Sequence, residues 1–204
     1  MGQKAVNKTA NILKNGGVAI FPTDTVYGFL ADAGNKKAIE KIFKIKKRAR
    51  SKPLPVFVKD IKMARELAEV NEWQEKILKK YWPGKYTFIL KSQISMSKFQ
   101  ITNSKLLTKN RTIAIRIPKY KFLNDLLKKI NKPLAQTSVN ISGKPELKKI
   151  KEIVAQFDNS KNKPDLIIDG GDLLKSKPSK IIDLSVKNKK VLRGWHILKY
   201  ILTW

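Results

Sequence analysis

The stretch LAQTSVNISGKPELKKIKEIVAQF, residues 134–157, changes its apolar spacing halfway along. Its first half alternates, which predicts a strand with one apolar face and one face of small polar side chains. That polar face consists of Ser138, Asn140 and Ser142. After Pro145, which suits the first turn of a helix, apolar residues recur at helical spacing: Leu147, Ile150, Val154 and Phe157. A strand followed by a helix is the repeating unit of α/β folds, so this stretch indicates that class.

The alternation of strands and amphipathic helices continues on both sides of this stretch. Further strands are predicted at 17–21, 54–58, 86–90, 112–117, 165–169, 180–185 and 189–193. Helices are predicted after the N-caps Asn35 and Asp60, and along the apolar stripes of 73–81 and 122–130. The polar stretch 91–111 is interpreted as a loop. No repeat or linker divides the chain, so we expect one α/β domain with a mixed sheet over residues 1–204.

The composition excludes several kinds of site. The chain has no cysteine, which rules out thiolate metal sites and cysteine nucleophiles. Its one histidine, His196, lies in an apolar tail, where packing or exposure explains it better than catalysis. Phosphate-binding glycine loops and metal-ligand spacings are absent as well, so an enzyme with this sequence would work by positioning and charge. No apolar run is long enough to span a membrane or act as a signal peptide, and we expect a cytoplasmic protein.

The charge balance points to phosphate-bearing partners. The chain carries 44 basic and 16 acidic residues, a formal net charge of +28. Such a field attracts nucleic acids or nucleotides. Most of the excess is lysine scattered through the sequence, so a general composition bias explains the charge equally well.

Two segments place cations where they could hold an anion. Four of them recur at every second residue, and an extended chain would carry them on one side: Lys46, Arg48, Arg50 and Lys52. A solvated basic loop is the alternative. Arg116 shares a face with Thr112 in a strand that is otherwise apolar, which costs free energy unless the arginine is paired or faces a polar cavity. There it would grip a carboxylate or phosphate; on an edge strand it would reach solvent instead.

Seven segments, in this order, resemble the YrdC-type family of threonylcarbamoyl-adenylate synthases (TsaC-like). They are FPTDTVYG (21–28), KIKKRARSKPL (44–54), WPGKYTFIL (82–90), IAIRIP (113–118), TSVNISG (137–143), KPSKIIDLS (177–185) and VLRG (191–194). The resemblance covers about residues 10–195, the expected core of the domain. It implies a twisted open sheet with flanking helices around a basic cavity.

The resemblance also implies a reaction, in which L-threonine, bicarbonate and ATP give threonylcarbamoyl-AMP and pyrophosphate. Such an enzyme is a nucleotidyltransferase, and ATP would bring Mg²⁺ with it. Partner proteins of the tRNA threonylcarbamoyl-transfer pathway then modify adenosine 37 of tRNA. The family's catalytic tetrad falls on Lys46, Arg48, Ser138 and Asn140. ATP would be bound by Arg48, Lys52, Thr112, Ser138, Asn140 and Arg193, and threonine by Thr25, Arg116 and Ser179, with no protein metal site.

The sequence departs from the family pattern at several positions. They are Ala49, Phe57, Val139, Lys180 and the pair Gly194–Trp195. Phe57 stands where some members carry a histidine, which puts that contact with threonine in doubt. We expect Ser142 and Gly143 to shape a turn, the segment 195–204 to pack on the body, and the extra C-terminal domain of longer members to be absent.

Two other functions remain open. One is an RNA-binding or ribosome-associated protein of this fold without the activity, with tRNA or other RNA as its partner. The other is a paralogue that acts on a different carbamoyl-type substrate. Neither would involve a membrane.

Overall fold

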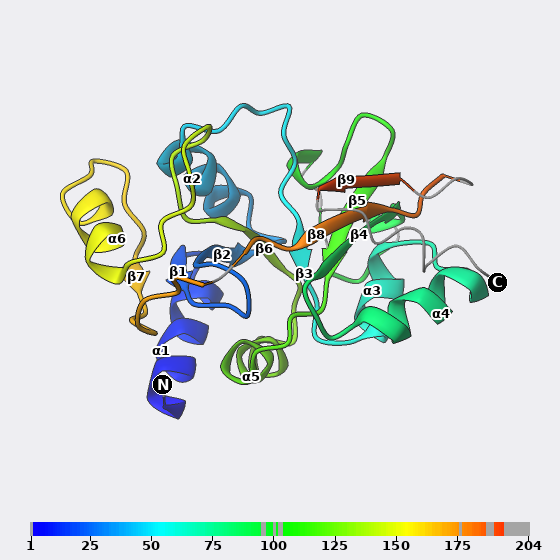
Figure 1. The fold of residues 1–204 in the computed structure, drawn as a ribbon, viewed down its shortest axis with the longest axis horizontal. Helices are drawn as coiled ribbons and strands as arrows, with labels where there is room; N and C mark the ends of the chain where they lie inside the picture. The colour runs from blue at the N-terminus through cyan, green and yellow to red at the C-terminus, as the bar shows by residue number, and fades with distance from the viewer. Residues whose placement is uncertain are drawn as a thin grey trace.

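A mixed β-sheet forms the centre of the computed structural model, which describes residues 2–94, 97–99, 101, 104–175, 177–186 and 190–193 (Figure 1). Within these residues the sheet has nine strands, in the order β7-β1-β2-β6-β3-β5-β4-β8-β9. The strands are β1 (Ala19–Phe21), β2 (Gly28–Asp32), β3 (Val56–Phe57), β4 (Tyr86–Lys91), β5 (Thr112–Arg116), β6 (Leu134–Ser138), β7 (Leu166–Ile167), β8 (Lys180–Asp183) and β9 (Lys190–Arg193). The sheet contains parallel pairs such as β3–β5 and antiparallel pairs such as β4–β5, which confirms the single α/β domain with an open mixed sheet.

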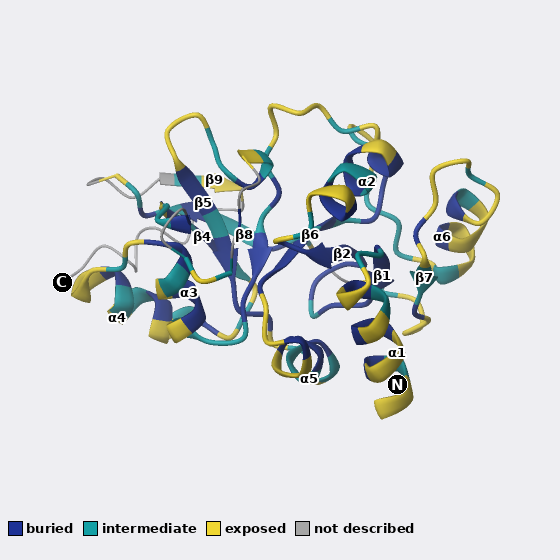
Figure 2. Ribbon diagram, turned by 180° about the vertical axis from the view of Figure 1, so that it is seen from behind, coloured by how far each residue is buried: buried dark blue, intermediate teal, exposed yellow. Residues whose placement is uncertain are grey.

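Helices cover both faces of the sheet. They are α1 (Gln3–Lys14), α2 (Lys36–Lys46), α3 (Ile61–Leu67), α4 (Glu72–Tyr81), α5 (Lys121–Ile130) and α6 (Ile150–Phe157), with a short 3₁₀ turn, η2, at Ser104–Leu106. α1 and α5 lie together below the sheet in Figure 1, and their apolar stripes form one core with Phe21, Leu30 and Leu134. α2, α3 and α6 contribute to the second core on the other face, which contains Ile20 and Phe29. Figure 2 shows the central strands β1, β2, β6 and β3 as the most buried part of the sheet.

The predicted helix caps are confirmed. The Asn35 side chain accepts a hydrogen bond from the Ala38 N–H (3.0 Å), and the Asp60 carboxylate accepts one from the Met63 N–H (2.7 Å). Each cap satisfies a backbone donor that the first helical turn leaves unpaired, which fixes where the helix begins.

Several predicted elements are shorter than the sequence indicates, among them the strands expected at 165–169 and 180–185, which are reduced to β7 and β8. The strand expected at 54–58 is reduced to β3, Val56–Phe57, flanked by residues that hydrogen-bond without strand geometry. The helix expected from Pro145 begins only at Ile150, because the chain between them turns back and the Leu147 N–H donates to the Val139 carbonyl. The apolar spacing thus extends beyond the helix itself.

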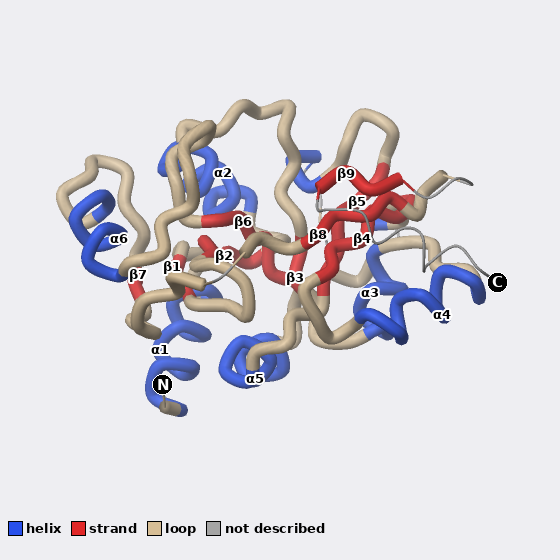
Figure 3. Tube along the Cα trace, viewed as in Figure 1, coloured by secondary structure: helices blue, strands red, loops and turns tan. Residues whose placement is uncertain are grey.

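Two elements are not predicted by the sequence patterns. α1 packs Val6, Ala10 and Leu13 against α5, although its many polar residues obscure this stripe. β2 follows the FPTDTVYG turn and is buried along its whole length, so it lacks the alternation typical of a strand with one exposed face. Figure 3 shows the long loop that leaves α2 and the loop that precedes β5 rising above the same edge of the sheet.

Candidate functional site

A cavity of about 270 Å³ opens at that edge of the sheet. Its lining includes six of the ten sequence-predicted site residues: Thr25, Arg48, Arg116, Ser138, Ser179 and Arg193. They come from segments spread over most of the chain, and the sheet order brings them together.

The sheet explains how polar side chains come to line this cavity. Leu134 on β6 belongs to the core beneath α1 and α5, and side chains two residues apart share a face of a strand. Gln136 and Ser138 therefore continue the Leu134 face beyond that core, where both line the cavity. The two faces of β5 are divided in the same way, since Ile113 and Ile115 are buried in the opposite core while Arg116 lines the cavity.

Arg116 on β5 is the most buried charged side chain of the cavity, with 1% of its surface exposed. Its Nε donates to the Gly84 carbonyl (2.8 Å), Nη1 to the Thr25 hydroxyl (3.0 Å) and Nη2 to the Asp24 carboxylate (2.5 Å). Burial lowers the pKa of Arg116, and the Asp24 carboxylate opposes that shift. β5 lies between β3 and β4, so the alternative of an edge-strand arginine that reaches solvent is wrong.

Asp24 and Phe57 orient Arg116, and neither role was predicted. The second Asp24 oxygen accepts from the Lys119 N–H (3.0 Å), which fixes the carboxylate between two donors. The Phe57 ring lies 5.6 Å from the guanidinium carbon, within cation–π range. The departure at Phe57 therefore places an aromatic face beside Arg116. Asp24 is visible in the sequence only as part of the FPTDTVYG turn.

Lys46 does not line the cavity, but it binds the backbone of Ser138, which does. Its side chain is 1% exposed, and Nζ donates to the Ser138 carbonyl (2.5 Å), the Asn140 carbonyl (2.9 Å) and the Asn140 side-chain oxygen (2.6 Å). The Ser138 hydroxyl donates to the same Asn140 oxygen (3.0 Å). Burial, followed by the nearby Arg48 charge, lowers the pKa of Lys46 to about 7. Three of the four tetrad residues are thus in direct contact.

The expected row of four cations is not formed. α2 ends at Lys46, and Lys47 adopts the left-handed conformation with φ +50°, which turns the chain away. Arg50 consequently points outward and pairs with Glu40 at 3.7 Å. The row required an extended chain, and a helix end followed by a turn occupies this place instead.

Arg48 reaches the cavity through its own loop. Nε donates to the Lys52 carbonyl (2.9 Å) and Nη2 to the Pro53 carbonyl (3.0 Å), while burial lowers the pKa of Arg48. The Lys52 side chain is exposed and does not line the cavity. Lys52 therefore contributes a backbone acceptor that positions Arg48.

The remaining predicted residues form two hydroxyl pairs. Thr112 does not line the cavity, but its hydroxyl oxygen lies 2.7 Å from that of Thr108, which does. The Ser179 hydroxyl lies 2.9 Å from that of Thr87 and accepts from Arg193 Nη2 (3.2 Å). Thr108 had no sequence signal, because it lies in the stretch expected to be a loop.

The polar row on β6 starts earlier than expected. The strand ends at Ser138, so Asn140 and Ser142 lie beyond it, and the Ser142 N–H donates to the Lys46 carbonyl. Gln136 is the residue that shares the strand face with Ser138. The two-residue period of a strand would have identified Gln136.

The expected turn at Ser142 and Gly143 is present, with φ +87° at the glycine. Gly194–Trp195, His196 and the segment 195–204 lie outside the described residues.

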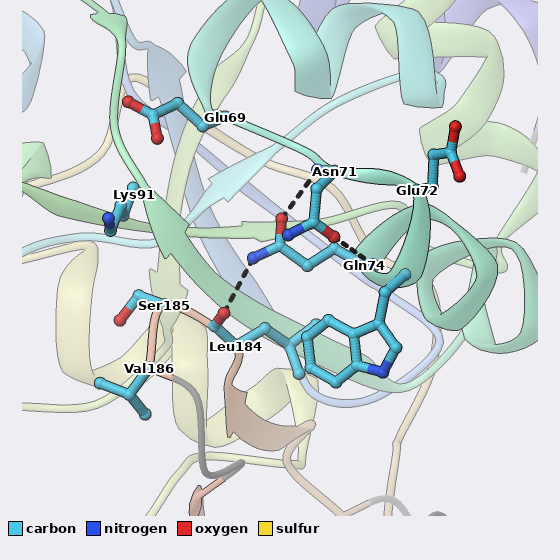
Figure 4. A pocket seen from close by; sticks show the side chains of 9 residues that line it. Glu69, Asn71, Glu72, Gln74, Lys91, Leu184, Ser185 and Val186 are labelled. Carbon is cyan, nitrogen blue, oxygen red and sulfur yellow. Dashed lines mark hydrogen bonds between the residues drawn. The ribbon is translucent and has the colours of Figure 1, made fainter. Parts of the chain in front are cut away.

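A separate hollow of about 740 Å³ lies between the start of α4 and the end of β8 (Figure 4). It contains none of the predicted site residues, and its amides are engaged in structural contacts. Asn71 and Gln74 form a reciprocal capping box, and Gln74 Nε2 donates to the Leu184 carbonyl (2.9 Å). This hollow therefore marks a junction that joins α4 to β8.

Replacing Gln74 with alanine should lower the free energy of unfolding by about 1–3 kcal/mol. The change removes one half of the capping box and leaves the buried Leu184 carbonyl without this donor. Chemical denaturation measures the effect, and Lys76→Ala on the exposed face of α4 is the matched control, with an expected change below about 0.5 kcal/mol. Equal effects of the two substitutions would contradict this role of Gln74.

The described residues contain no cluster of three or more histidine, cysteine, aspartate or glutamate side chains able to hold a metal ion. Over the same part of the chain, every helix is too short or too polar to cross a membrane.

A family model for Sua5, YciO and YrdC proteins, described as "Telomere recombination", matches residues 11–194. The threonylcarbamoyl-AMP synthase of Pyrococcus abyssi is 31% identical over 177 residues, which are 86% of this chain and 49% of that protein. A putative threonylcarbamoyl-AMP synthase of Methanocaldococcus jannaschii is 36% identical over 170 residues, 83% of this chain and 75% of that protein. The crystal structure of P. abyssi Sua5 complexed with L-threonine matches with a TM-score of 0.84 at 29% identity, over 95% of this chain and 54% of that one. The chain thus spans about half the length of these P. abyssi proteins.

Proposed function

Since the chain belongs to the Sua5/YciO/YrdC family, we propose that it forms threonylcarbamoyl-AMP and pyrophosphate from L-threonine, bicarbonate and ATP. It is then a nucleotidyltransferase that supplies the activated group for tRNA modification, with the proteins of the transfer pathway as its partners. We expect a reaction that consumes ATP and serves tRNA to take place in the cytoplasm.

Arg116 is the observation that carries this proposal. Three of its five N–H groups are engaged by Gly84, Thr25 and Asp24, which leaves one on each terminal nitrogen for a ligand. Two parallel N–H donors match the two oxygens of a carboxylate. The Thr25 and Ser179 hydroxyls line the same cavity. We therefore assign the threonine carboxylate to Arg116, with the rest of the amino acid between these hydroxyls.

The other side of the cavity suits the reacting phosphate. Arg48, Ser138 and Arg193 line it. Lys46 donates to the Ser138 carbonyl, and the Asn140 side-chain oxygen accepts from the Ser138 hydroxyl, which holds Ser138 in place. A volume of about 270 Å³ accommodates an amino acid and one phosphate group better than a whole nucleotide. In this assignment the adenosine and the outer phosphates extend towards the cavity mouth, where the exposed Lys52 side chain gives a weaker contact than the resemblance implies, while the buried Thr112 acts through its hydroxyl contact with Thr108.

The chemistry requires alignment and charge neutralisation, with no protein nucleophile. The threonine amine combines with bicarbonate to give a carbamate and water. A carbamate oxygen then forms a bond to the α-phosphorus of ATP as the bond to the departing pyrophosphate breaks. Arg116 holds one anion and Arg48 the other, so the protein overcomes their repulsion and stabilises the charge that develops on the phosphates.

Magnesium fits this scheme as part of the substrate ATP. Asp24 precedes Thr25 of the cavity lining, but its carboxylate is already bound by Arg116 and the Lys119 N–H. Among the described residues, the cavity lining itself contains no carboxylate. Phosphate oxygens and water are therefore the expected ligands, and the ion would neutralise charge on the departing pyrophosphate.

The two alternatives are less well supported by this site. An RNA-binding protein without the activity would have no use for a buried, oriented arginine in a cavity too small for a polynucleotide. A paralogue with another carbamoyl-type substrate would keep Arg48 and Lys46 but would not require the Arg116–Thr25 contact.

The proposal is tested with purified protein, MgATP, bicarbonate and labelled L-threonine. We expect release of pyrophosphate together with a labelled adenylate, and both should disappear when bicarbonate or threonine is omitted. Failure to form either product with all substrates present, by a protein that is folded in circular dichroism, would overturn the proposal.

Replacing Asp24 with asparagine should raise the KM for threonine about 10-fold while the KM for ATP changes less than about 2-fold. Asparagine keeps the size of the side chain but removes the charge that orients Nη2 of Arg116. Because the change leaves the buried Arg116 charge without its partner, circular dichroism first checks that the variant is folded. Initial rates with each substrate varied in turn then measure the effect, and Asp125→Asn, at a partly exposed position on α5, is the control. A lower kcat with unchanged KM for both substrates would show that Asp24 acts elsewhere.

A further inference from the structure

A second, strongly basic groove lies outside the candidate site, between the outer face of α2 and the segment 161–165. Its volume is about 860 Å³, and six lysines line it: Lys36, Lys37, Lys41, Lys44, Lys161 and Lys163. α2 presents four of these because residues four apart on a helix share a face. Figure 2 shows exposed surface along α2.

The acidic residues of this groove are already paired. Asp165 binds Lys41 at 2.5 Å and accepts the Val18 N–H at 2.7 Å, while Glu40 pairs with Lys105. Among the described residues, no carboxylate lies within ion-pair distance of Lys37, Lys44 or Lys161. The groove therefore presents an uncompensated positive charge to solvent.

We propose that this groove binds the phosphodiester backbone of a polynucleotide. Lysine ammonium groups act as point charges towards phosphates and do not select a base, so the binding should be independent of sequence. A protein partner fits less well, because protein interfaces are depleted in lysine and centred on apolar anchors. The only apolar residue in this lining is Pro164, which is buried. A flat membrane surface cannot follow the hollow between α2 and 161–165, and no exposed apolar side chain in the lining could insert into it.

The groove and the candidate site share one helix. Lys44 is exposed in the groove, and two residues later the same helix ends with Lys46 behind the cavity wall. The groove lining and the cavity lining have no residue in common, so the proposed binding is independent of the proposed enzyme activity.

A charge-matched comparison separates this groove from the general excess of lysine. The variant Lys37→Glu, Lys44→Glu, Lys161→Glu changes the groove, and Lys8→Glu, Lys76→Glu, Lys128→Glu removes the same charge from exposed positions on α1, α4 and α5. The probe is a labelled single-stranded RNA of mixed sequence, titrated at several salt concentrations. A DNA of the same sequence and vesicles with anionic lipids serve as parallel probes.

We expect the RNA affinity of the groove variant to fall at least about 30-fold, and its salt slope to shrink by roughly 0.7 for each phosphate that the protein no longer neutralises. The affinity of the control variant should fall less than about 3-fold. An equal fall with DNA supports recognition of the shared phosphodiester chemistry, and a fall with RNA alone identifies RNA as the source. Equal effects in both variants, unchanged RNA binding, or weaker vesicle binding alone would overturn the proposal. Adenylate synthesis by the groove variant should equal that of the unmodified protein, which keeps the two proposals distinguishable.

Discussion

Replacing Arg116 with lysine is expected to lower kcat/KM for L-threonine by at least about 100-fold while the KM for ATP stays within about 2-fold. Lysine keeps the positive charge beside Asp24 but has no planar pair of N–H groups for a carboxylate. The effect should therefore concentrate on threonine. Initial-rate measurements with each substrate varied in turn give both parameters.

Lysine is preferred to alanine at this position because Arg116 and Asp24 form a buried ion pair, 2% and 7% exposed in their side chains. Removing one partner of such a pair costs about 3–5 kcal/mol, so Arg116→Ala mixes unfolding with weaker binding. Arg65→Lys is the matched control, because Arg65 forms an ion pair on the surface of α3. Equal effects on the kinetic parameters for threonine and for ATP, in a folded Arg116→Lys variant, would show that Arg116 does not bind the threonine carboxylate.

Lys46→Met should reduce turnover at least about 100-fold, although Lys46 does not line the cavity. Its Nζ holds two backbone carbonyls and the Asn140 side chain, so the substitution releases the chain that carries Ser138. Steady-state kcat measures the effect, and the exposed Lys44→Met on the same helix is the control. Near-normal turnover would show that Lys46 has only a structural role.

The same variant should change how stability depends on pH. In the folded protein the pKa of Lys46 is lowered to about 7 from 10.5, mainly by burial. Between these pH values the unfolded chain binds more protons, so this group makes stability rise with pH, by at most about 1.4 kcal/mol per unit. Below pH 7 both states are protonated and the cost of the buried ammonium is fully present.

Denaturation of both proteins from about pH 6 to about pH 10 measures this linkage. The difference in free energy of unfolding, unmodified protein minus Lys46→Met, should increase as the pH rises through that interval. The Lys44→Met control should give a flat difference. A flat profile for Lys46→Met would mean that the buried amine keeps an ordinary pKa.

Much of the fold could be predicted from local patterns. Asn35 and Asp60 cap helices as expected, because capping depends on residues three apart in sequence. The two faces of β5 also follow directly from alternation, with Ile113 and Ile115 in the core and Arg116 in the cavity. These features require no knowledge of which strands become neighbours.

The features that the sequence did not predict depend on distant contacts or on one backbone angle. Asp24 becomes informative only when it meets Arg116 across 92 positions of the chain. The prediction of a cation row was wrong because Lys47 takes a positive φ, which no residue pattern in that segment indicates. Residues such as Thr108 and Gln136 gain their place from the loops and strands that close the cavity.

The candidate site is completed late in synthesis, because β8 and β9 contribute to it. β8 pairs in parallel with β4, so that Tyr86 lies opposite Lys180, and β9 then pairs with β8. As the chain leaves the ribosome, β4 emerges long before its partner, and its outer edge has no strand to pair with. Ser179 and Arg193 arrive with the late strands. A ligand that needs the complete cavity would therefore stabilise only chains in which β8 and β9 have joined the sheet. Binding of such a ligand would indicate that this last step of sheet formation has taken place.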